Sequence, residues 1–106
     1  MADRLLIVED EDTLCASLQR VFLREGYEVD MADSAETAFT LLDRKSYDLI
    51  ITDIILPGIS GIDLLKKYRK TKPTQKVIVI TAYASLTTAV ESIKAGACDF
   101  IIKPLM

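Results

Sequence analysis

The residues most able to do chemistry in this sequence stand directly after apolar runs. Four consecutive acids, residues 9–12, follow the run Leu5–Val8, and Asp53 ends a second such run. A hydroxyl, Thr81, and an ammonium, Lys103, close two later runs. Carboxylates can hold a hard cation or attack phosphorus, and hydroxyl and ammonium groups can bind phosphoryl oxygens. These residue types together indicate phosphoryl chemistry.

Crowded carboxylates need a positive partner, because like charges repel and removal from water raises the cost. Few oxygen ligands, with room left for water, favour Mg²⁺. The ion would offset the repulsion and hold phosphoryl oxygens against Asp53, the nucleophile that would become an acyl phosphate. Lys103 would pair with Asp53 before the reaction and with a phosphoryl oxygen afterwards. Thr81 would donate a hydrogen bond to another phosphoryl oxygen.

The elements that must position these residues alternate between strand and helix along residues 1–106, which we treat as one domain. Segments 5–8, 49–51 and 77–80 are apolar throughout, which is typical of strands buried on both faces. Segment 27–31 alternates apolar with acidic residues, which favours an edge strand, and 100–102 is the last strand. We therefore predict an α/β fold: a flavodoxin-like, doubly wound, five-stranded parallel sheet of order 2-1-3-4-5.

That strand order brings the candidate residues together. Ligands of such sheets bind outside the carboxyl ends of the strands, where the strand order reverses, here between the first and third strands. Each residue also has an ordinary alternative: acids favour a helix N-terminus, Asp53 suits a turn, and Thr81 and Lys103 could be a plain strand end and a solvated lysine. Their coincidence at four strand ends makes the joint site the stronger interpretation.

Helical stripes lie between the strands. Residues 14–25 form the first stripe, closed by Gly26, and Ser34 is a good N-cap for the second. The third helix is expected to bury Ile62, Leu65 and Tyr68 and to show Lys66, Lys67, Arg69 and Lys70 to solvent. The fourth carries the stripe Leu86, Ala89, Val90 and Ile93.

Composition excludes several classes of function. The net charge of -3 and the lack of a basic stripe argue against direct nucleic-acid binding, and the longest apolar runs are too short to span a membrane. We expect a soluble, cytoplasmic protein with two reduced core thiols, Cys15 and Cys98. Without histidine there is no Ser-His-Asp triad, no histidine-ligated zinc and no internal histidine phosphodonor.

The whole chain resembles the response regulator receiver domains of two-component signalling. The matching motifs are the run 5–11, the loop from Asp53 to Pro57 followed by Gly61, Thr81-Ala82, and Lys103-Pro104. The stretch 81–104 is most similar to receivers of the nitrogen-regulatory class of sigma-54-dependent activators. A member of this family is a switch and not a turnover enzyme, although it assists its own phosphorylation and dephosphorylation.

The resemblance implies a role for each matching position. Asp53 would accept phosphate from a sensor histidine kinase. Glu9, Asp10 and the backbone carbonyl of Ile55 would hold Mg²⁺ together with Asp53. Thr81 and Phe100 would be the switch pair, with the hydroxyl moving toward phosphate and the ring turning inward.

The resemblance also implies where the signal is read out. The readout surface would be the fourth helix and fifth strand, which would also carry a homodimer contact. The output domain, transcriptional in most such proteins, would lie outside this chain. The Lys103-Pro104 bond would be cis and would aim the lysine into the crevice.

Three departures from the family pattern lead to further expectations. Glu9 stands where many members carry aspartate, and its extra methylene would let it act on the metal through water. Ile55 and Tyr83 replace polar groups able to orient water, which predicts slow autodephosphorylation. The chain ends at Met106, where a fifth helix should begin, so we expect a receiver truncated before that helix. A patch of the third to fifth strands would then be bare and would favour self-association.

The same residues bear on three rival interpretations. A haloacid-dehalogenase-type phosphatase needs a second acid two residues after its nucleophile, where this chain has Ile55. A flavin binder needs a phosphate loop after the first strand, and here that loop is acidic. The serious rival is a receiver-fold interaction module that takes no phosphate, and the joint presence of the acids, Thr81 and Lys103 argues against it.

Overall fold

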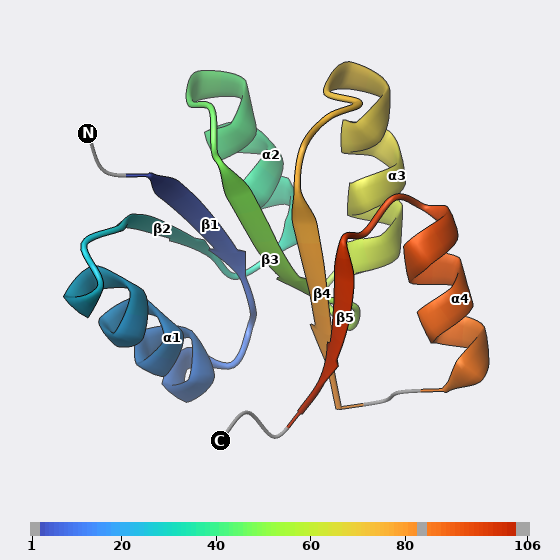
Figure 1. Cartoon of the computed structure of the whole chain (residues 1–106), viewed down its shortest axis with the longest axis horizontal. Coiled ribbons are helices and arrows are strands. Elements are labelled where there is room, and N and C mark those ends of the chain that lie inside the picture. The colour runs from blue at the N-terminus through green and yellow to red at the C-terminus, as the bar shows by residue number, and fades with distance from the viewer. Residues whose placement is uncertain (1–2, 83–84, 104–106) are drawn as a thin grey trace.

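The computed structural model describes residues 3–82 and 85–103, apart from the side chain of Leu86. Tyr83 and Pro104, and with them the predicted cis bond, lie outside this range. The strands are β1 (Arg4–Val8), β2 (Glu28–Ala32), β3 (Leu49–Asp53), β4 (Val77–Thr81) and β5 (Asp99–Ile102). The helices are α1 (Asp12–Arg24), α2 (Ala35–Arg44), α3 (Gly61–Thr71) and α4 (Leu86–Lys94). Figure 1 shows them in strict alternation along the chain.

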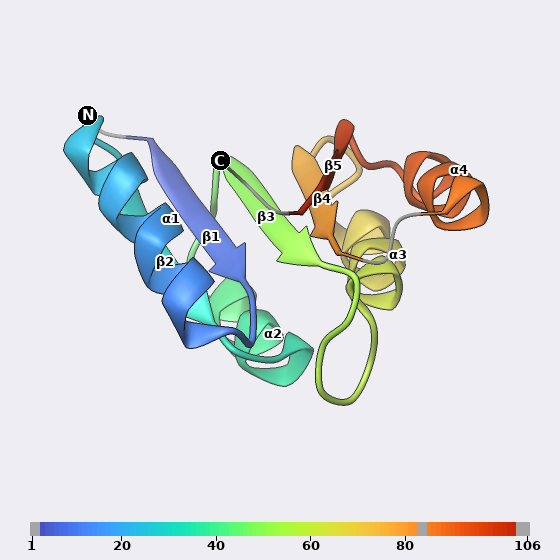
Figure 2. The same cartoon turned by 90° about the horizontal axis from the view of Figure 1, so that it is seen from below.

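The five strands form one parallel sheet in the order β2-β1-β3-β4-β5, which confirms the predicted topology. In Figure 2, α1 lies on one side of the sheet beside β1 and β2, α2 and α3 lie on the other, and α4 lies beside β5. Among the described residues, no helix follows β5. Parallel pairing therefore brings all the carboxyl ends of the strands to one edge.

The main core lies between the sheet and α2 and α3. Five apolar strand residues on this face are completely buried, namely Leu6, Val8, Ile50, Val77 and Val79. Leu64 and Leu65 of α3 pack in the same cluster. Burial of each such side chain contributes about 1.5–3 kcal/mol. This core fixes the strands whose ends carry the candidate site.

Serine caps fix where three of the helices begin. Ser34 accepts a hydrogen bond from Thr37 N, Ser60 from Asp63 N, and Ser85 from Thr88 N. Each satisfies a backbone N–H that the first helical turn leaves without a partner, and a cap of this kind contributes about 1 kcal/mol. The predicted cap at Ser34 is thus confirmed.

Several sequence predictions were wrong in detail. β2 covers residues 28–32 and not 27–31. Cys15 is buried, but Cys98 is exposed, because the turn after α4 carries it away from the core. Arg69 is not fully solvated but half-buried, because its guanidinium bonds to backbone carbonyls.

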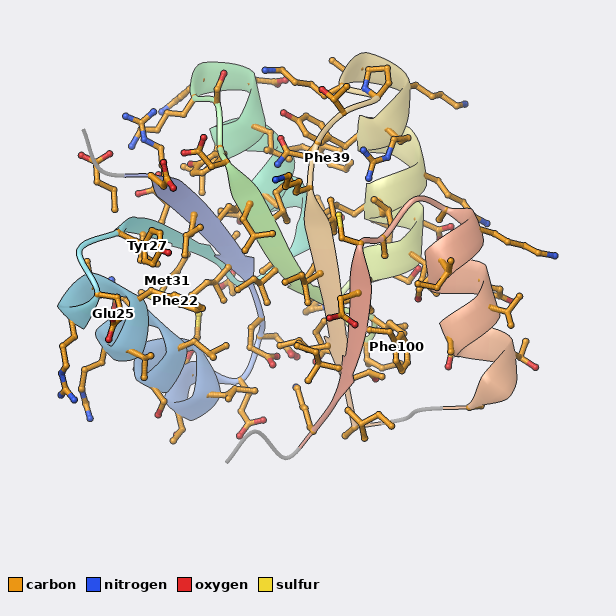
Figure 3. The ribbon with its side chains drawn as sticks, viewed as in Figure 1. Phe22, Glu25, Tyr27, Met31, Phe39 and Phe100 are labelled. Carbon is orange, nitrogen blue, oxygen red and sulfur yellow. The ribbon has the colours of Figure 1, made fainter. Side chains whose placement is uncertain are left out.

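The apolar stripes of the outer helices are also less buried than predicted. Val21 in α1 is exposed, although Phe22 beside it packs edge-to-face on Tyr27 with ring centroids 5.9 Å apart (Figure 3). Val90 and Ile93 in α4 are exposed as well, because α4 lies at the β5 edge and not over the sheet centre.

The sheet face that carries α1 is only partly open. Ile51 and Ile80 on this face are buried, so the expectation of a wholly bare patch was too strong. Leu49, Ile78 and Ile101 are half-buried, since no described helix covers β3, β4 and β5 on this side (Figure 2). The open part is therefore a short apolar strip across three strands.

Candidate functional site

The candidate residues meet at the carboxyl edge of the sheet. Asp53 ends β3, Thr81 ends β4, and Glu9 and Lys103 immediately follow β1 and β5. A pocket of about 320 Å³ opens at this edge. Its lining residues are Glu9, Asp10, Glu11, Asp53, Ile55, Ala82 and Lys103. The juxtaposition expected from the strand order is therefore present.

Lys103 joins the two buried carboxylates of the pocket. Its Nζ lies 2.8 Å from Asp53 Oδ2 and 2.5 Å from Glu9 Oε1. The Glu9 contact is an ion pair without hydrogen-bond alignment, whereas Nζ donates a hydrogen bond to Asp53. The side chain of Glu9 is fully buried, and those of Asp53 and Lys103 are nearly so. One ammonium thus balances two carboxylates in a site largely removed from water.

Burial and mutual charge perturb the titration of these groups. Burial raises the pKa of the Glu9 carboxyl, and the charge of Asp53 raises it further, against the lowering effect of the contact with Lys103 and of the hydrogen bond from Glu11 N–H. Burial alone would lower the pKa of Lys103, but its contacts with Asp53 and Glu9 outweigh that and raise it. The pocket therefore favours a charged lysine and carries an excess of acid.

The third acid, Asp10, is exposed at the mouth of the pocket. Carboxylate oxygens of Glu9, Asp10 and Asp53 all lie within 4.8 Å of one another. Such a set, with two buried acids and one open to water, fits a hard divalent cation that keeps part of its hydration shell. These are the acids predicted to hold the metal.

The loop after β3 is built around Asp53. Ile55 N donates to Asp53 Oδ1 at 3.2 Å, and Gly61 N donates to Ile54 O at 2.8 Å. A Cβ on Gly61 would lie only 1.9 Å from Asp53 O, so this close approach of backbones requires glycine. The first residue of α3 thereby fixes the backbone of the aspartate.

The two predicted switch residues, Thr81 and Phe100, differ in burial and in position relative to the pocket. Thr81 is completely buried, and its carbonyl accepts a hydrogen bond of 2.8 Å from Lys103 N. Phe100 is half-buried and packs against the core between β5 and α4 (Figure 3), and it is not among the residues that line the pocket. Ile55 is exposed and lines the pocket, as expected for a residue flanking the site.

Sequence reasoning from the residues alone missed two features of the site. Glu11 was treated as part of an acidic run, yet it lines the pocket and its N–H donates to Glu9 Oε2 at 3.3 Å. The contact between Gly61 and Asp53 was also missed, because their separation of eight positions gives no periodic signal. A glycine just behind a serine cap is the one local clue to it.

The chain matches a known protein family and curated relatives. The family described as response regulator receiver domain matches residues 5–106. The chain is 39% identical over 101 residues to the alginate biosynthesis transcriptional regulatory protein AlgB of Pseudomonas putida, a match that covers 95% of this chain and 22% of that protein. The chain thus spans about a fifth of the length of the curated relatives it matches.

Two solved structures extend the comparison. The beryllofluoride-activated NtrC4 receiver domain dimer superposes with a TM-score of 0.92 at 33% identity, covering 97% of this chain and 85% of that one. This confirms the narrower resemblance to nitrogen-regulatory receivers. A response regulator from Burkholderia pseudomallei, solved with a phosphorylated aspartic acid and a calcium ion, gives a TM-score of 0.91 at 30% identity, covering 98% and 61%.

Within residues 3–82 and 85–103, no helix combines the length and the apolar character needed to cross a membrane.

Proposed function

We propose that this chain, which belongs to the response regulator receiver domain family, is a switch that accepts a phosphoryl group on Asp53 from a sensor histidine kinase. The observation that carries the proposal is the pocket in which Asp53 and Glu9 share one ammonium, that of Lys103. The phosphorylated aspartic acid of the Burkholderia protein supports it by similarity.

The transfer step exchanges one bond to phosphorus for another. A carboxylate oxygen of Asp53 forms the new bond while the bond from phosphorus to the donor nitrogen breaks. The leaving imidazole keeps the electron pair and takes a proton from water. Lys103 then stabilises the phosphoryl oxygens, and its contact with Glu9 keeps the ammonium in the pocket meanwhile.

Mg²⁺ fits the residues present. Glu9, Asp10 and Asp53 supply hard carboxylate oxygens close together, and we assign the Ile55 carbonyl as the fourth protein ligand. When bound, the ion supplies positive charge that offsets the carboxylates and the incoming phosphate. Asp10 and Asp53 would hold the ion, and Glu9, fully buried against Lys103, would contribute its negative charge to the same cluster.

The phosphoryl group then changes the charge at the end of β4. It adds about -1.5 to -2 charges where Thr81 and Lys103 lie, enough to bias a loop and helix with two arrangements. In our proposal Thr81 donates to a phosphoryl oxygen, Phe100 turns inward, and α4 with β5 becomes the surface read by a second copy and by a transcriptional output domain.

The test is incubation of the chain with acetyl phosphate and Mg²⁺, followed by measurement of intact mass. We expect the mass of one phosphoryl group to appear in the parent chain and not in Asp53→Asn or in the presence of a chelator. A folded parent chain that gains no phosphate would instead favour the alternative, an interaction module of receiver fold that is not phosphorylated.

A further inference from the structure

The half-buried Arg69 links three parts of the chain at the end of the sheet opposite the phosphoacceptor pocket. Its Nη1 donates to Pro73 O at 2.9 Å and to Gln75 O at 2.5 Å, and its Nη2 donates to Gly96 O at 2.7 Å. The two carbonyls that Nη1 contacts belong to the connection between α3 and β4. The third belongs to the turn between α4 and β5. One guanidinium thus fastens α3 to both neighbouring connections.

The contact with Gly96 is built into the turn. Gly96 has φ +106°, and a Cβ on it would lie 2.7 Å from Arg69 Nε. Only glycine both adopts this conformation without strain and lets the guanidinium approach so closely. Arg69 Nε itself is buried without a hydrogen-bond partner, a cost that the three bonds to carbonyls must offset.

The helix that Arg69 reaches is otherwise weakly held. Val90 and Ile93 of α4 are exposed, and Ser92 is the fully buried side chain among those described in this helix. Ser92 donates to Thr88 O of the same helix, so that bond does not join α4 to the sheet. With little apolar burial among the side chains described in α4, polar contacts at its two ends must contribute a larger share of its stability.

The two ends of α4 are held by different kinds of contact. At the start of α4, the capping box of Ser85 and Thr88 lies within the helix itself. At the other end, Arg69 donates from a different helix, and its charge is favourable beside the negative end of the α4 dipole. A groove of about 500 Å³ separates α3 from α4 at this point, lined by Lys66, Arg69, Lys70, Glu91, Lys94 and Ala95.

We propose that Arg69 is a positioning residue that holds the C-terminal end of α4 fixed, so that α4 responds to phosphate by moving at its N-terminal end. This inference rests on the proposed phosphorylation of Asp53. Thr81, at the end of β4, precedes the segment that leads to the start of α4, so a change at the pocket reaches that end first. With its other end held by Arg69, the helix pivots and does not shift as a whole.

Amide hydrogen exchange of the full chain, with and without acetyl phosphate and Mg²⁺, tests the inference. In the parent chain, phosphorylation should change exchange at residues 86–90 and leave residues 94–98 protected. Arg69→Ala should raise exchange at 94–98 about tenfold before any phosphate is added, and should spread the phosphate response over all of α4. Arg69→Lys keeps the positive charge but loses the two guanidinium nitrogens that donate to different carbonyls. It should show the same effect to a smaller extent.

Lys70→Ala is the matched control, an exposed cation one position along the same helix, and it should leave both regions unchanged. The inference is overturned if Arg69→Ala and Lys70→Ala give equal exchange at 94–98. It is also overturned if Arg69→Ala raises exchange uniformly over the domain, or if phosphate alters both ends of α4 alike in the parent. Intact mass measures phosphorylation separately. If Asp53 is not modified, the exchange measured without acetyl phosphate still decides whether Arg69 holds the turn at residues 94–98.

Discussion

Lys103 Nζ lies 2.8 Å from Asp53 Oδ2 and so joins the end of β5 to the end of β3 across β4. The same ammonium contacts the fully buried Glu9. In the absence of a divalent cation, Lys103 is the positive charge that makes two neighbouring carboxylates tolerable. The proposed phosphorylation site is therefore also a stability determinant.

Replacement of Lys103 by methionine should expose this second role. Two buried carboxylates would lose their shared cation, which costs about 3 kcal/mol of unfolding free energy. Added Mg²⁺ should recover part of the loss, because it supplies charge to the same acids. Denaturant unfolding with and without Mg²⁺ measures both effects. The exposed Lys67→Met is the control, and equal losses for both variants would contradict the assignment.

Asp10 should matter for the metal and not for the fold, because it is the exposed member of the acid cluster. Asp10→Asn removes one negative charge at the mouth of the pocket and should weaken Mg²⁺ binding at least about tenfold with little change in stability. Titration calorimetry measures the affinity. Asp12→Asn, in the first turn of α1, is the matched control, and a similar loss there would mean that general charge, not ligation, governs binding.

Gly61→Ala should distort the pocket at Asp53, although the two residues are eight positions apart in the sequence. The new Cβ would meet Asp53 O at 1.9 Å, so the backbone of Asp53 must shift. A misplacement of this size can lower the rate of phosphorylation by about a hundredfold. Gly26→Ala is the control, since it has φ +94° but nothing within 4 Å of its Cβ. It should cost about 1 kcal/mol of strain and leave the phosphorylation rate unchanged.

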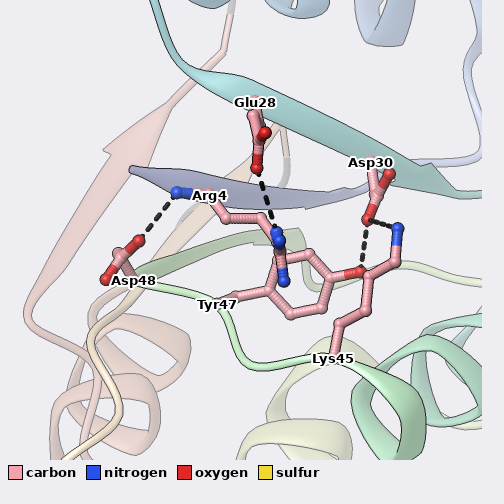
Figure 4. A network of polar contacts seen from close by, with 6 residues as sticks. All are labelled: Arg4, Glu28, Asp30, Lys45, Tyr47 and Asp48. Carbon is pink, nitrogen blue, oxygen red and sulfur yellow. Dashed lines mark hydrogen bonds and ion pairs between the residues drawn. The ribbon is translucent and has the colours of Figure 1, made fainter. Parts of the chain in front are cut away.

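A polar network at the amino edge of the sheet predicts a pH dependence. Tyr47 donates to Asp30 Oδ2 at 2.6 Å, and Lys45 contacts the same oxygen at 3.2 Å (Figure 4). The hydrogen bond from Tyr47 lowers the pKa of Asp30, more than burial raises it. Burial and Asp30 raise the pKa of Tyr47. The folded state thus favours a charged Asp30 and a neutral Tyr47.

The sign of the effect follows from those directions. Because the pKa of Asp30 is lowered on folding, its contribution is present above the ordinary value of 3.8 and is lost as the pH falls through the lowered value. Tyr47→Phe should therefore lose about 1 kcal/mol at neutral pH, and its difference from the parent should shrink in acid. Chemical unfolding over a pH series measures this. A difference that stays constant into strong acid would count against the bond.

The fold was predictable because three of its strands contain runs that are apolar at every position. Runs such as Leu5–Val8 can only be buried on both faces, and the acidic alternation of the second strand marked an edge. The site followed from topology, since parallel strands bring Glu9, Asp53 and Thr81 to one edge whatever their separation in sequence.

The remaining features depend on tertiary contacts that no local pattern encodes. Arg69 looked like one more solvated cation on α3, yet its length lets it reach carbonyls of two connections. Val90 and Ile93 have the spacing of a buried stripe but lie at the sheet edge. The contact of Gly61 with Asp53 depends on the path of a loop. The sequence pattern predicts the helices and strands. The contacts that single side chains make across the fold can be seen only in the packed structure.

The central claim is that Asp53, among several neighbouring acids, is the residue that becomes an acyl phosphate. The most direct measurement is reduction of the phosphorylated chain with borohydride, which converts an aspartyl phosphate to homoserine, followed by peptide mass mapping. We predict homoserine at position 53 only, in a reaction that requires Mg²⁺. Homoserine at Asp10, or phosphate retained by Asp53→Asn, would contradict the account.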